Sequence, residues 1–144
     1  MVRELWFDLD GTLADLYGVV GWLIDLQEGR TRPYKVAKPC LRLNTLARLL
    51  HKAQSKGYKI GVISWTSKAG TKRYNAEVAR VKREWLKQHL PSVAWDTIDI
   101  VKYGTPKQQG RAGILFDDEE GNRLAWGEQA YTPDKIFEIL RGLN

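Results

Sequence analysis

The chain has 144 residues, 43% of them hydrophobic and 28% charged, so it is long enough for one domain with a buried core and too short for two ordinary ones. A formal net charge of +6 predicts a surface that attracts anions, which makes phosphorylated small molecules and nucleic acid candidate partners. Cys40 is the only cysteine, which excludes an internal disulfide and favours a reducing, cytoplasmic setting. The longest apolar tract, 16–26, is too short to cross a bilayer and no secretory signal is visible, so we expect no membrane partner.

A short apolar run, Leu5 to Phe7, predicts a strand that leads directly into Asp8-Leu9-Asp10-Gly11-Thr12. Side chains repeat every second residue along an extended chain, so Asp8 and Asp10 leave the strand end on the same side. Two carboxylates this close favour a cation between them, and hard oxygen ligands suit Mg²⁺. A plain surface turn is the alternative, because Asp and Gly are common in turns.

The next stretch predicts two helices separated by a loop. Residues 14–28 carry apolar side chains at roughly helical spacing, so we expect a helix or helical turn that packs against the rest of the domain. Residues 29–39 contain a glycine, two prolines and several charges, which predict a loop. Residues 44–55 predict a helix with an inner face of leucines, ended by Gly57.

Residues 58–64 form a β-branched run that predicts a second strand. The strand–helix–strand order predicts an α/β fold with a parallel, doubly wound sheet. Ligands bind at the carboxyl ends of the strands in such sheets, so Ser64 should lie near the first acid pair. Thr66 and Ser67 are close enough to be alternatives. Trp65 either stacks on a nucleobase or packs as an ordinary aromatic side chain.

Residues 71–90 predict a long helix with an apolar stripe and several basic residues mostly off it. That basic face either binds nucleic acid or is simply solvated, the commoner arrangement. Residues 95–101 predict a third strand, followed by Lys102 and Lys107. Each of these lysines is either a cation of the site or a solvated surface charge.

The chain then repeats the arrangement of its first motif. Residues 112–116 predict a strand that runs into Asp117 and Asp118, two further acids and a turn. A solvated loop or the start of a helix is the alternative, because acids are favoured in the first turn of a helix. Residues 130–131 predict a short edge strand, and a last helix follows with Pro133 in its first turn.

Asp8-Leu9-Asp10-Gly11-Thr12-Leu13 resembles the first motif of the haloacid dehalogenase (HAD) superfamily of phosphotransferases, and Asp117-Asp118 resembles its fourth. The resemblance implies a Rossmann-like, HAD-type single domain over residues 1–144, with a small cap inserted at about 16–40. It implies that Asp8 is the nucleophile, Asp10 the general acid and base, and Ser64 a holder of a phosphoryl oxygen.

The same resemblance implies a cofactor and further contacts. Mg²⁺ would be bound by Asp8, the Asp10 carbonyl and Asp117, with Asp118 in support through water or hydrogen bonds. Substrate would meet the backbone after Asp8, at Gly11 and Thr12, and the side chain of Trp65.

Lys107 lies ten residues before Asp117. This spacing is similar to that of the superfamily's 5'(3')-deoxyribonucleotidases, so Lys107 is preferred to Lys102 as the cation that neutralises nucleophile and phosphate. The resemblance therefore implies a Mg²⁺-dependent phosphatase that acts through an aspartyl phosphate on a nucleotide-like phosphomonoester. A phosphatase of nucleic-acid ends, a phosphatase of other small metabolites and a non-catalytic binding module are the alternatives.

Overall fold

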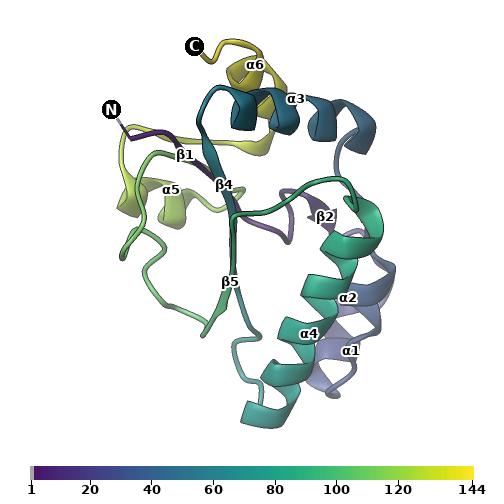
Figure 1. Cartoon of the computed structure of the whole chain (residues 1–144). Coiled ribbons are helices and arrows are strands. Elements are labelled where there is room, and N and C mark those ends of the chain that lie inside the picture. The colour runs from purple at the N-terminus through teal and green to yellow at the C-terminus, as the bar shows by residue number, and fades with distance from the viewer. Residues whose placement is uncertain (1) are drawn as a thin grey trace.

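A five-stranded sheet forms the centre of the computed structural model, which describes residues 2–144 (Figure 1). The strand order is β5-β4-β1-β6-β7, and every neighbouring pair is parallel. The strands are Glu4–Phe7 (β1), Lys59–Trp65 (β4), Thr97–Val101 (β5), Ile114–Phe116 (β6) and Ala130–Tyr131 (β7). Because β1 lies at the centre, the residues after it are flanked by the carboxyl ends of β4 and β6.

Helices cover both faces of the sheet. The longer ones, α3 (Leu43–Ser55) and α4 (Lys72–His89), share one face with α6 (Ile136–Arg141), and α5 (Glu120–Trp126) lies on the other. Alternation along β1 divides the core accordingly, since Leu5 and Phe7 face the first layer and Trp6 faces Trp126 of α5. The predicted doubly wound α/β architecture is confirmed. Within residues 2–144, no helix has the length and apolarity to cross a membrane.

The predicted helix over 14–28 is wrong in its first half. Residues Ala14–Asp15 form a short strand, β2, that pairs antiparallel with β3 (Lys38–Pro39). Helix α1 (Trp22–Gln27) begins only at Trp22. The Asp15 carboxylate accepts the Gly18 N–H at 3.0 Å, which closes a turn in place of a helical one. The expected packing is also only partial, because Val20 is 91% exposed.

The predicted loop over 29–39 contains a short helix, α2 (Arg32–Val36), with Pro33 in its first turn. The carboxylate of Asp25 in α1 pairs with Arg30 at 2.8 Å and with Arg32 at 2.7 Å, which fixes α2 against α1. The Tyr74 hydroxyl of α4 donates to the Arg30 carbonyl at 2.8 Å. The 16–40 segment is therefore ordered by its own ion pairs and is attached to α4, beside which it lies in Figure 1.

The rest of the chain follows the predicted elements closely. Helix α4 begins after Thr71, whose side chain accepts the Tyr74 N–H at 3.1 Å as an N-cap. The acids and turn predicted after residue 116, with a helix start as the alternative, lead into helix α5, which extends to Trp126. Residues 133–135 form a 3₁₀ turn before α6.

Candidate active site

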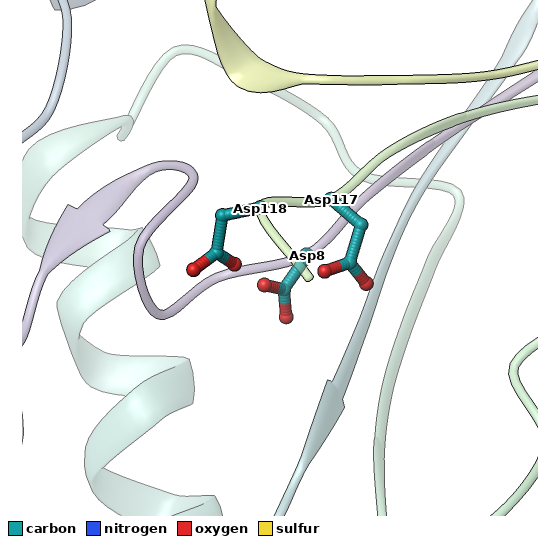
Figure 2. Close-up of side chains that lie close together, drawn as sticks. All are labelled: Asp8, Asp117 and Asp118. Carbon is teal, nitrogen blue, oxygen red and sulfur yellow. The ribbon is translucent and has the colours of Figure 1, made fainter. Parts of the chain in front are cut away.

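Polar side chains follow the ends of three neighbouring strands. Asp8 follows β1, Ser64 is the next-to-last residue of β4, and Asp117 follows β6. The register pairs Phe7 with both Val62 and Phe116, so these ends lie at the same edge of the sheet. Figure 2 shows the side chains of Asp8, Asp117 and Asp118 close together at this edge.

Asp8 is held on both of its carboxylate oxygens and is only 7% exposed. Oδ1 accepts from Lys107 Nζ at 2.9 Å, and Oδ2 accepts from the Thr12 hydroxyl at 3.3 Å. Its own N–H donates to the Phe116 carbonyl at 2.9 Å. The side chain therefore has a fixed orientation, and it faces a cavity of about 430 Å³.

Asp8, Asp117 and Asp118 form an acidic cluster in which one oxygen of each carboxylate lies within 4.8 Å of the others. Burial, then the hydrogen bond and charge of Asp8, raise the pKa of Asp118 to about 8. Burial and the charge of Asp8 likewise raise the pKa of Asp117. Carboxylates that resist joint ionisation are stabilised by a cation between them, and their hard oxygens suit Mg²⁺. These residues therefore fit the metal ion that the sequence predicts.

Of the two candidate lysines, the structure brings Lys107 to the acidic cluster. Lys107 is 3% exposed, and its Nζ donates to Asp8 Oδ1 at 2.9 Å and to Asp117 Oδ2 at 2.7 Å. Burial alone would lower its pKa, but the charges of Asp8 and Asp117 outweigh burial and raise that pKa. Lys102, by contrast, is exposed.

Ser64 and Asp10 are linked by hydrogen bonds to the same side chain, that of Lys82. The side chain of Ser64 is buried, and its Oγ accepts from Lys82 Nζ at 2.8 Å, while the same Nζ donates to Asp10 Oδ2 at 2.8 Å. Thr66 and Ser67 also line the cavity, so the polar strand end extends beyond Ser64.

Lys82 is the residue of the site that the sequence analysis missed. A solvated face and nucleic-acid binding are the two alternatives for the basic residues of its helix, yet Lys82 is buried, with 1% of its surface exposed. A signal was present in the spacing: Lys82 lies four residues after Val78 and three before Trp85, on the same helical stripe as these buried side chains. A lysine on an apolar stripe indicates a buried partner.

Gly11 and Thr12 contact the acidic residues and not the open cavity. Gly11 has a φ of 80°, and a Cβ there would lie 2.3 Å from Asp118 Oδ2, so a side chain would displace Asp118. The buried Thr12 hydroxyl donates to Asp8, and the N–H groups of Gly11 and Thr12 donate to the carbonyls of Ala14 and Leu9. Substrate binding by these two residues stays a prediction.

Aromatic side chains dominate one wall of the cavity. Trp65 packs on Tyr103 with ring centroids 4.9 Å apart, and its indole N–H donates to the Thr105 carbonyl at 2.8 Å. The 16–40 segment also lines the cavity and contributes Tyr17 and Trp22, in contact at 5.0 Å between ring centroids. Lys68 and Asn122 add polar groups to the cavity. The cavity therefore combines apolar walls with an acidic and cationic floor.

The basic face of α4 is partly neutralised. Arg80 pairs with Glu77 and Glu84 on the same helix, and Arg83 donates to the Ile98 carbonyl at 2.9 Å. These internal partners are typical of a solvated helix face. Nucleic-acid binding by this helix stays a prediction.

Comparison with known proteins identifies the fold. No protein-family model matches the sequence, and no curated protein matches it significantly. The structure is similar to that of D,D-heptose 1,7-bisphosphate phosphatase from Burkholderia thailandensis, with a TM-score of 0.58 and 11% sequence identity. The match covers 96% of each chain. This likeness confirms the predicted Rossmann-like α/β fold.

Proposed function

We propose that the protein is a Mg²⁺-dependent phosphatase of the HAD superfamily that forms an aspartyl phosphate and acts on a nucleotide-like phosphomonoester. The observation that carries the proposal is Asp8, whose carboxylate is held by Lys107 at 2.9 Å on the floor of an open cavity. The motif around Asp8 and the fold shared with a phosphatase support the same activity.

In the proposed reaction, an oxygen of Asp8 attacks phosphorus while the bond from phosphorus to the leaving oxygen breaks. Asp10 gives its proton to that leaving oxygen. Asp10 then takes a proton from a water molecule that attacks the aspartyl phosphate, and inorganic phosphate leaves as Asp8 is restored. Both aspartates line the cavity, which supports their action on one bound group.

The remaining phosphoryl oxygens would be bound by Ser64, Lys107 and backbone N–H groups after Asp8. Since the N–H groups of Gly11 and Thr12 donate to carbonyls of their own turn, the N–H groups of Leu9 and Asp10 are the better candidates. Together these donors would surround the phosphoryl group with partial and full positive charge.

Asp8, the Asp10 carbonyl and Asp117 would hold Mg²⁺, with Asp118 in support. When bound, the ion would reduce the repulsion between the nucleophile and the phosphoryl oxygens and stabilise charge at the transition state. The pKa values of Asp117 and Asp118 are raised by burial and by the charge of Asp8, and a cation at this position would offset both causes.

The substrate class is inferred from the walls of the cavity. The cavity offers aromatic surfaces for a flat ring at Trp65 and Tyr103 and at the aromatic residues of the 16–40 segment. We infer that this segment acts as a minimal cap. The single cysteine supports a reducing, cytoplasmic setting.

A phosphatase screen tests the proposal with Mg²⁺ and three substrate groups: nucleoside monophosphates, sugar phosphates and oligonucleotides with 3' or 5' phosphates. We expect hydrolysis of the nucleoside monophosphates, loss of that activity in excess EDTA, and none from Asp8→Asn. Preference for sugar phosphates would favour a small-metabolite phosphatase, the kind of activity named for the similar structure. Preference for oligonucleotides would favour a phosphatase of nucleic-acid ends that binds its substrate through the basic surface. Turnover that persists in EDTA would overturn the metal assignment.

A further inference from the structure

A buried ammonium group connects two residues of the candidate site. Lys82 Nζ donates to Asp10 Oδ2 at 2.8 Å, to Ser64 Oγ at 2.8 Å and to the Trp65 carbonyl at 2.6 Å. Lys82 lies in the middle of α4. Of its three partners, Asp10 follows β1, and Ser64 and Trp65 are the last two residues of β4. The contact therefore joins a helix to two adjacent strand ends.

The three contacts use all the donors that Lys82 has. An ammonium group carries three hydrogens and no lone pair, so each of its hydrogens already has an acceptor. The side chain is also 1% exposed. Lys82 is consequently in no position to bind a phosphoryl oxygen directly, and any role in the reaction acts through its partners.

A cation at this position is not required for packing. The neighbouring members of the stripe, Val78, Val81 and Trp85, are apolar and buried, and a methionine would fill similar volume without a charge to desolvate. A buried ammonium is stable only with full hydrogen bonding and opposite charge nearby. The ring of Tyr34, from the 16–40 segment, lies 5.1 Å from Nζ and adds a favourable contact on that side.

We propose that Lys82 is a positioning residue that fixes the Asp10 carboxylate and the Ser64 hydroxyl relative to each other and to one bound phosphoryl group. This inference rests on the proposed function. Because Ser64 Oγ accepts from Lys82, its own hydrogen is left to donate to a phosphoryl oxygen. Because Lys82 occupies Asp10 Oδ2, Oδ1 is left for proton transfer to the leaving oxygen and from water.

The first test compares Lys82→Met with Lys87→Met, an exposed lysine of the same helix. We expect Lys82→Met to lower kcat for an alkyl phosphate by about 10²-fold, the usual effect of a misplaced reacting group, with a smaller change in KM. Lys87→Met should match the wild type. Equal kinetics for the two variants would overturn the proposal.

A mutant cycle separates positioning from general structural support. In a background that carries both Asp10→Asn and Ser64→Ala, Lys82→Met should lower kcat by no more than about twofold, because its effect acts through these two residues. A full additional loss in that background would overturn the proposal. Intact-protein mass spectrometry adds a second measurement: with p-nitrophenyl phosphate, Lys82→Met should accumulate phosphoenzyme, since hydrolysis of the intermediate needs a placed Asp10.

Folding of the variants is measured by circular dichroism, and Lys82→Gln replaces Lys82→Met in both tests if the methionine variant is unfolded. If neither variant folds while Lys87→Met does, Lys82 is a structural residue and the proposal fails. An inactive wild type would instead refute the proposed function. An active wild type with unchanged Lys82 variants would refute only the role of Lys82.

Discussion

Replacement of Lys107 by alanine removes a buried cation that contacts both Asp8 and Asp117, at 2.9 and 2.7 Å. At an effective dielectric constant of about 20, each pair contributes about 6 kcal/mol of Coulomb energy, much of which the desolvation of the groups offsets. Loss of one preorganised donor lowers turnover by about 10²–10³-fold in well-studied sites. We expect a loss near 10³-fold, because Lys107 carries a full charge and would face both nucleophile and phosphate.

The same substitution also affects folding. Removal of one partner from a buried pair destabilises by about 3–5 kcal/mol, and protonation of the neighbouring acids should keep the cost near the lower value. For a domain of this size, about 3 kcal/mol lowers Tm by about 10 °C. The assay is therefore run well below the Tm of the variant, with circular dichroism as a check on folding.

The assay is steady-state hydrolysis of an aryl phosphate with Mg²⁺, and Lys102→Ala is the matched control, since Lys102 is exposed in the same loop. Turnover by the control should stay close to that of the wild type. If Lys102→Ala is the damaging substitution and Lys107→Ala is not, the assignment of the neutralising cation is wrong.

Three further outcomes are expected. Asp8→Asn should abolish turnover in a folded protein, because an amide cannot supply the nucleophilic oxygen. Asp10→Asn should still become phosphorylated by acetyl phosphate, which mass spectrometry detects. Phosphate on the Asp8→Asn protein would place the nucleophile elsewhere. The pKa of Asp118 is raised from 3.8 to about 8, so its stabilising contribution is present in acid and lost as pH rises through that value. Thermal melts of the metal-free protein should show lower stability at about pH 9 than at about pH 6, and Mg²⁺ should raise Tm more at the higher pH; equal shifts would contradict the pKa. Gly11→Ala should weaken Mg²⁺ binding in calorimetry, because a Cβ would lie 2.3 Å from Asp118 Oδ2, whereas Gly29→Ala, with open space around its Cβ, should not.

The sheet and its carboxyl edge were predictable because the signals are local. Apolar runs that end in Asp8, Ser64 and Asp117 define strands, and parallel strands place their ends together. Lys107 was preferred to Lys102 only through the family resemblance of its spacing to Asp117, since local patterns left both lysines open. The structure brings Asp8, Ser64 and Lys107 to one cavity, and the buried Asp117 accepts a hydrogen bond from Lys107.

Two features depended on contacts that local patterns do not contain. The 14–28 stretch has helical spacing, but the Asp15 side chain closes a turn at Gly18 and Gly21 takes a φ of 77°, so the helix starts late. The sequence analysis did not single out Lys82, because a charged residue on a helix is usually solvated. Its acceptors lie 72 and 18 residues away in the chain and become neighbours only in the folded sheet.

The wholly parallel pairing of the sheet has a consequence for the order of folding. Each strand pair closes a long loop, and the Lys107–Asp8 contact joins positions 99 residues apart, so the acidic cluster assembles only after most of the sheet has formed. In the unfolded chain Asp8 is far from Asp117 and Asp118, so its carboxylate does not repel theirs. A cation that binds the cluster would therefore stabilise the native state more than the transition state for folding, and would act chiefly by slowing unfolding.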